Sequence, residues 1–202
     1  ITESHTTVIN NNGLLGGGTN FFAVSARPAD SNGGPGSTLT LNNAATGALQ
    51  SVIAVDLSGQ FDGTQSVRLE NATINNDGLI GSTFNSIQGS VSDTLTVNNT
   101  GTLRTADGGV GFASLGMTAT GGQTTIVNNS GVIEVLSANG GFVGTEGVAI
   151  SASGFLPEDG VTQEYNIVNS GTISSTGHAI SMRGVTEHNE VFTVNITNTV
   201  TG

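Results

Sequence analysis

The chain has 202 residues, of which 31 are glycine, 35% are hydrophobic and none is cysteine; 15 acidic against four basic residues give a formal charge of −11. The absence of cysteine excludes disulfides, thiolate metal sites and cysteine nucleophiles, and the scarcity of basic residues excludes a nucleic-acid-binding surface, because neutralising phosphates needs clustered positive charge. No run of 18 apolar residues occurs, so the sequence predicts no transmembrane helix.

One short motif recurs along the chain. In each copy an apolar residue precedes asparagine, and a polar residue and a glycine follow. Another apolar residue comes two places after that glycine, and β-branched residues and threonine surround each copy. Such a unit predicts a strand, a tight polar corner and a second strand, and we expect the corner glycines to adopt positive φ. The copies span residues 9–15, 41–49 (with a small insertion), 74–80, 97–103, 127–133, 167–173 and a degenerate 196–200, where Val200 replaces glycine.

A second, glycine-led run follows most corners, at residues 111–115, 147–151 and 177–181, and predicts a further strand in each coil. The corner glycines Gly13, Gly47, Gly78, Gly101, Gly131 and Gly171 are 34, 31, 23, 30 and 40 residues apart, which are intervals typical of solenoid coils with loops. No stretch sustains a helical apolar period. We therefore predict an all-β solenoid forming a single domain over residues 1–202. A β-sandwich is the alternative, although it does not require the same corner at every turn.

The terminal segments are strand-like, and a solenoid has two open ends that must be covered. Residues 1–8 and 191–202 are predicted as terminal strands, which either pair with a neighbouring copy or pack on their own β-helix. The candidate assembly residues are Ile1, Val8, Phe192, Val194, Ile196 and Val200.

Evidence for chemistry is thin. Glu187, His188 and Glu190 form the only dense polar cluster, with Arg183 nearby, and this cluster suits either a metal or proton site or an ordinary polar loop. No Gly-x-Ser-x-Gly motif occurs, and a single tyrosine without tryptophan offers little for sugar stacking, so no enzyme activity and no cofactor are predicted. Calcium binding is suggested only by acidic residues that are expected to be exposed, namely Asp56, Asp62, Asp107, Glu158 and Asp159. No recognisable calcium-binding loop occurs, and no ligands are assigned.

The recurring [Ile/Val]-Asn-Asn-[Ser/Thr]-Gly-x-[Ile/Leu] motif followed by Gly-x-Ala-Ile-Ser resembles the passenger regions of bacterial autotransporters, from about residue 8 to residue 200. The resemblance implies a right-handed parallel β-helix and an extracellular or cell-surface location. It implies little about activity, because such passengers include adhesins, aggregation factors, proteases and esterases. The start at Ile1 fits either a secreted product whose signal peptide has been removed or a trimmed chain.

These features favour a secreted structural protein that self-assembles through its ends or terminal strands into an extracellular filament or surface fibre, with copies of itself as partner. The alternative is a monomeric adhesin that binds glycans or another component of a host or matrix surface. An enzyme acting on an acidic polysaccharide is a distant third.

Overall fold

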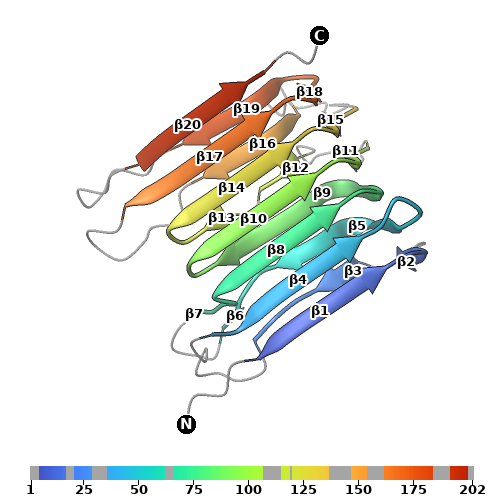
Figure 1. Cartoon of the computed structure of the whole chain (residues 1–202), viewed down its shortest axis with the longest axis vertical. Coiled ribbons are helices and arrows are strands. Elements are labelled where there is room, and N and C mark those ends of the chain that lie inside the picture. Colours follow the sequence, from blue (N-terminus) through green and yellow to red (C-terminus); the bar gives the residue numbers. More distant parts are fainter. Residues whose placement is uncertain are drawn as a thin grey trace.

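The computed structural model describes residues 5–16, 21–28, 36–61, 66–106, 115–118, 120–136, 147–153, 162–183 and 192–199. These residues form β-strands joined by turns, and none of them is helical. The strands stack along the long axis of the molecule, with the chain winding from one end to the other (Figure 1).

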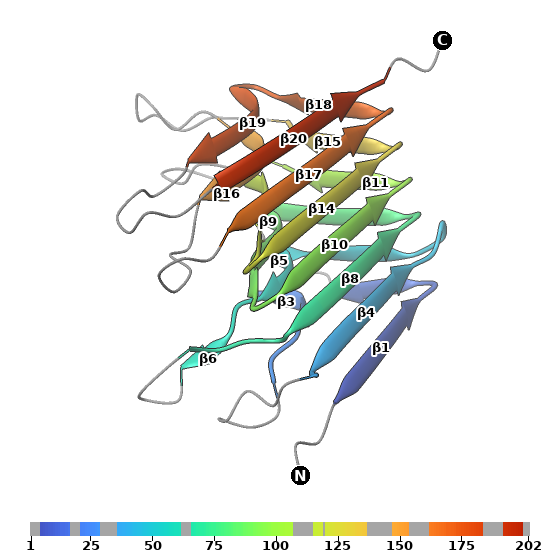
Figure 2. The same ribbon diagram turned by 60° about the vertical axis from the view of Figure 1, so that its left-hand side comes forward.

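The first sheet contains one strand from each successive coil, and all its strands run parallel (Figure 2). In spatial and chain order they are β1 (Thr6–Asn11), β4 (Thr38–Asn43), β8 (Asn71–Asn76), β10 (Thr94–Asn99), β14 (Thr124–Asn129), β17 (Gln163–Asn169) and β20 (Phe192–Asn198). Parallel pairing of each strand with its counterpart one coil later makes the molecule a parallel β-solenoid. A β-sandwich is excluded, because its sheets are antiparallel.

The second sheet is also parallel and follows the corner in each coil. Nearest the corner lie β2 (Leu14–Gly16), β11 (Thr102–Thr105), β15 (Val132–Val135) and β18 (Thr172–Ser175); farther along lie β3 (Phe22–Ser25), β12 (Leu115–Met117), β13 (Thr120–Gly121), β16 (Val148–Ser153) and β19 (His178–Arg183). Two long strands, β5 (Ala48–Leu57) and β9 (Leu79–Val91), occupy both positions. A small antiparallel pair, β6 (Gln60–Phe61) and β7 (Ser66–Val67), lies apart.

The glycine-led runs are confirmed as the next strands of their coils where they can be followed. The runs at 147–151 and 177–181 correspond to β16 and β19, and the run at 111–115 reaches β12 at Leu115. Its residues 111–114 lie outside the described part of the chain.

The core consists of apolar columns, because in-register parallel strands place equivalent side chains above one another. One column joins the strands of the first sheet through residues that are at most 1% exposed: Leu41, Ile74, Val97, Val127 and Ile167. A second column faces it from the other sheet and is equally buried: Leu49, Ile80, Leu103 and Ile133. The repeated apolar positions of the motif therefore line one continuous interior.

The expectation that the corner glycines adopt positive φ is wrong. Within the described residues, glycines with positive φ are Gly16, Gly36 and Gly89. The corner needs glycine because successive corners stack closely: a Cβ at Gly101 would lie 2.2 Å from the carbonyl oxygen of Gly78, and one at Gly131 would lie 2.1 Å from that of Gly101. Only glycine permits this approach of one backbone to the next.

Candidate functional site

An unbroken ladder of asparagines runs through the corners from one end of the solenoid to the other, and every member except the exposed Asn198 is buried. Nδ2 of each asparagine donates a hydrogen bond of 2.7–2.8 Å to Oδ1 of the asparagine in the next coil. The same Nδ2 groups also satisfy corner carbonyls; Nδ2 of Asn99, for example, lies 3.3 Å from O of Gly101 and 3.1 Å from O of Val132. We call this series the inner ladder: Asn11, Asn43, Asn76, Asn99, Asn129, Asn169 and Asn198.

A second asparagine series lies on the outer face, one residue earlier in each strand, and has the opposite polarity. Here Nδ2 of each asparagine donates to Oδ1 of the asparagine in the preceding coil, at 2.8–2.9 Å. We call it the outer ladder: Asn10, Asn42, Asn75, Asn98 and Asn128. In the last two coils its positions are occupied by Val168 and Thr197.

At the N-terminal end, β1 pairs with β4 on one side, and its other edge has no strand partner within the described residues. Ile9 begins the apolar column and is only half-buried. Oδ1 of Asn11, the first acceptor of the inner ladder, receives only the backbone N–H of its own corner, from Gly13 at 3.3 Å, among the described residues. No atom lies within 4 Å of a Cβ built on Gly13, in contrast to the corner glycines above it.

At the C-terminal end, β20 pairs with β17 and likewise has one edge without a strand partner in the described part of the chain. Ile196 ends the apolar column and is 51% exposed, whereas its interior counterparts are at most 1% exposed. Oδ1 of Asn198 accepts Nδ2 of Asn169 at 2.7 Å. Its own Nδ2 has no acceptor among the described residues.

The predicted assembly residues divide between the two ends. Phe192, Val194 and Ile196 all lie in β20, and the Phe192 ring packs 5.1 Å from the ring of Tyr165. Val8 lies in the opposite edge strand, β1, where it is 56% exposed and alternates with the core-facing Ile9. Ile1 and Val200 lie outside the described residues.

Sequence reasoning missed four residues that the structure places at the ends: Ile9, Asn11, Gly13 and Asn198. The signal was present, because each is a member of the repeated motif. What the sequence did not reveal is that the motif positions stack into columns and ladders whose first and last members are unmatched.

The candidate chemical sites are not assembled within the described residues. The Glu187–Glu190 cluster, Asp62, Asp107, Glu158 and Asp159 fall outside them, and Arg183 is the last residue of β19. The part of the chain that the structure describes contains no group of three or more histidine or acidic residues placed to hold a metal ion.

The expectation that Asp56 is exposed is wrong, because its side chain is fully buried. It accepts hydrogen bonds from Oγ of Ser25 at 3.3 Å and Nε2 of Gln88 at 3.1 Å, and Nη2 of Arg27 lies 3.8 Å away. A buried carboxylate is stable only with such partners. Asp56 therefore ties together three successive coils.

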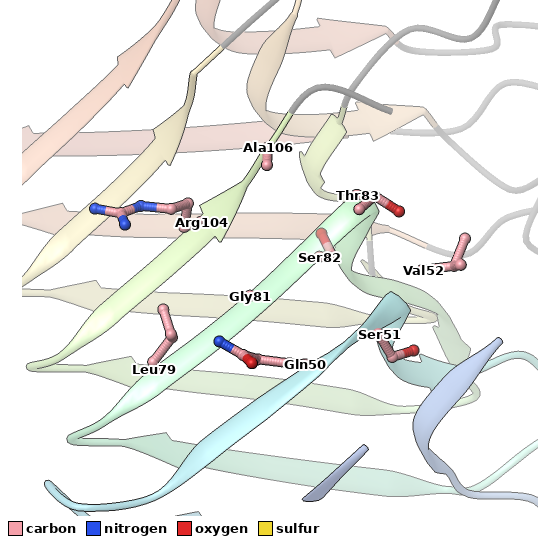
Figure 3. Close-up of a pocket in the computed structure, with 9 residues that line it drawn as sticks. All are labelled: Gln50, Ser51, Val52, Leu79, Gly81, Ser82, Thr83, Arg104 and Ala106. Carbon is pink, nitrogen blue, oxygen red and sulfur yellow. The ribbon is translucent and has the colours of Figure 1, made fainter. Parts of the chain in front are cut away.

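A lateral trough of about 320 Å³ opens on the side of the solenoid (Figure 3). In one register column Gln50 and Arg104 flank Gly81, and Thr83, two residues farther along β9, also lines the trough. Nε of Arg104 is 2.6 Å from Oε1 of Glu134, one coil later. Gly81 is unusual among the strand glycines, because a Cβ there would meet only side-chain atoms at ordinary distances of 3.7–3.8 Å and its φ is not positive.

Comparison of the chain with protein-family models, curated proteins and solved structures finds no match. A search of the described residues for a helix long and apolar enough to cross a membrane finds none.

Proposed function

We propose that this chain is a structural subunit of an extracellular fibre and that it assembles through the two ends of its β-solenoid. The observation that carries the proposal is the abrupt loss of burial at the end of the core column. Ile196 is 51% exposed, although the residues at the same position in the interior coils are at most 1% exposed. A column of apolar side chains that is buried from solvent along its length but exposed at its end is covered when another coil stacks on that end with an apolar residue at the same position.

The strand edges support the same proposal. Soluble β-proteins usually protect an edge strand with charge, proline, a bulge or a covering segment. The described strands β1 and β20 carry no charged residue and no proline, and the apolar side chain of Ile196 in β20 is 51% exposed. Such an edge favours pairing with another strand.

The rest of the proposed function is a secreted, non-enzymatic protein similar to an autotransporter passenger. The repeated corner motif, the acidic composition and the lack of cysteine support this part. In this proposal the partner of the protein is a second copy of itself, and no cofactor takes part.

Sedimentation velocity over a range of protein concentrations tests the assembly. We expect the wild-type protein to form larger species as its concentration rises. Ile196→Asp should remain monomeric, because it places a charge at the end of the apolar column. Leu136→Asp is the matched control, since Leu136 is also 51% exposed but lies just after β15, away from both ends. A wild-type protein that stays monomeric at every concentration would contradict the proposal.

The lateral trough supports a second candidate function, that of an adhesin for a glycan. A glycine inside a strand weakens the strand and often marks a place where a ligand approaches closely; at Gly81 neither φ nor a nearby backbone requires glycine. The exposed amide of Gln50, the exposed hydroxyl of Thr83 and the guanidinium of Arg104 surround the hollow.

A glycan array probed with monomeric protein tests this second candidate. We expect wild-type protein to bind a subset of the arrayed glycans and Gly81→Gln, which fills the trough, to lose that binding. Gly13→Gln places the same side chain in open space at a corner and serves as the control. Equal binding by wild-type protein and Gly81→Gln would rule out the trough as the site.

A further inference from the structure

We propose that copies join head to tail, with β20 of one copy pairing in parallel with β1 of the next, so that Nδ2 of Asn198 donates to Oδ1 of Asn11 in that next copy. This inference rests on the proposed function and adds the partner strand, the polarity and the register. It follows from the two ends being complementary in hydrogen bonding, in apolar contact and in backbone shape.

The inner ladder supplies the first argument. Every bond in it runs from Nδ2 of one coil to Oδ1 of the next, so the ladder ends in a donor at Asn198 and begins with an acceptor at Asn11. The acceptor holds only a long bond of 3.3 Å from its own corner, within the described residues. A head-to-tail contact matches the donor with the acceptor, whereas a contact between two like ends brings donors or acceptors together.

The outer ladder runs in the opposite direction and matches at the same junction. Its first member, Asn10, accepts Nδ2 of Asn42 at 2.8 Å and presents its own Nδ2 at the N-terminal end. The equivalent position in β20 is Thr197, whose exposed hydroxyl is able to accept a hydrogen bond. The junction therefore pairs Asn10 with Thr197 beside the pair formed by Asn198 and Asn11.

The apolar core continues in the same register. Carrying the pairing of the interior strands across the junction sets Ile9 of one copy on Ile196 of its neighbour. These are the two end members of the column and the ones that are not fully buried. One register thus completes both ladders and the core column.

The corner at Gly13 provides an independent argument. At Gly101, Gly131 and Gly171 a Cβ would lie 2.6–2.8 Å from the carbonyl oxygen of the residue just before the corner glycine of the preceding coil; at Gly171 this is O of Ser130. A Cβ on Gly13 meets no atom within 4 Å, and the described residues place no coil beneath this corner. In the head-to-tail junction, the carbonyl of Thr199 of the preceding copy takes that place. Glycine at this first corner is then required by the junction and not by the isolated subunit.

The junction belongs to the first sheet. The second sheet ends with β18 and β19 in the coil before β20. Among the described residues, the coil of β20 adds no strand to the second sheet. The contacts that fix the junction are therefore those of Ile9, Asn10 and Asn11 with β20.

Disulfide trapping tests the polarity and register, because the chain has no cysteine of its own. The variants are Asn10→Cys and Thr197→Cys, both at exposed positions. Neighbouring parallel strands lie about 4.8 Å apart, which suits a disulfide. Mixing the two variants under mild oxidation should give cross-linked dimers that contain one chain of each kind, whereas either variant alone should give few.

Two outcomes of this experiment overturn the inference. Cross-links within Asn10→Cys alone or Thr197→Cys alone would show contact between like ends. Larger species in sedimentation without cross-links between the two variants would show that copies assemble elsewhere. Both results leave the proposed fibre standing, whereas protein that stays monomeric contradicts the fibre itself.

The Gly13→Ala variant tests the junction without adding charge. We expect it to keep the melting temperature of the wild-type monomer. The protein concentration that it requires for assembly should be at least tenfold higher than that of wild type. Gly81→Ala is the matched control, since its added methyl group also meets no close contact but lies on the lateral face; it should assemble like wild type. Normal assembly of Gly13→Ala would overturn the proposed stacking of Gly13 on Thr199.

Discussion

At the scale of single residues, the asparagine of the motif stabilises the corner through its side chain. Asn99 is fully buried, accepts Nδ2 of Asn76 at 2.7 Å and donates to Oδ1 of Asn129 at 2.7 Å. Buried amides are tolerated only when their donors and acceptors are paired. The ladder meets that condition in every interior coil, which explains why this position of the motif varies so little.

Replacing one inner-ladder asparagine should therefore be costly. In Asn99→Ala, Nδ2 of Asn76 and Oδ1 of Asn129 lose their ladder partner, and we expect the free energy of unfolding to fall by about 3 kcal/mol. Asn98→Ala is the control, because Asn98 belongs to the half-buried outer ladder, and it should cost less than about 1 kcal/mol. Urea denaturation of the monomer measures both; equal losses would contradict the distinction between the ladders.

The corner glycines give a second prediction at this scale. Gly101→Ala places a methyl group 2.2 Å from the carbonyl oxygen of Gly78, so the backbone of two coils must move apart. We expect a loss of about 2–3 kcal/mol or more in the free energy of unfolding. A stability equal to that of wild type in the same urea experiment would show that the corners are not as closely stacked as described.

At the scale of elements, the sequence was sufficient to identify the strands before and after each corner, because the apolar positions and the corner residues repeat. It did not predict that β5 and β9 each run through both positions of the second sheet. It also placed Asp56 on the surface. Its partners Ser25 and Gln88 are distant in sequence, and only the pairing of β3, β5 and β9 brings them together.

The edge strands should differ from the central ones in hydrogen exchange. Within the described part of the monomer, β1 and β20 are each paired on one side only, so we expect their amides to exchange faster than those of β8 and β10. Assembly should then protect β1 and β20 together. Protection of only one of the two strands in assembled material would be inconsistent with a β20–β1 junction.

At the scale of the whole molecule, the same repeat that builds the subunit provides its means of assembly. Each coil buries its apolar residues and pairs its asparagines with the coils on either side, and the first and last described coils lack one of these neighbours among the described residues. The sequence predicted that the ends would be open and named Phe192, Val194 and Ile196 among their residues. It did not predict which end meets which, because the polarity of a ladder depends on the orientation of the amides.

The most direct test of end-to-end assembly is cryo-electron microscopy of the concentrated wild-type protein. The account predicts unbranched fibres in which the first sheet continues from copy to copy. Seven strands per copy at about 4.8 Å give an axial repeat of about 34 Å. Dispersed single rods at high concentration, or fibres whose repeat contains two copies in opposite orientations joined by like ends, would contradict it.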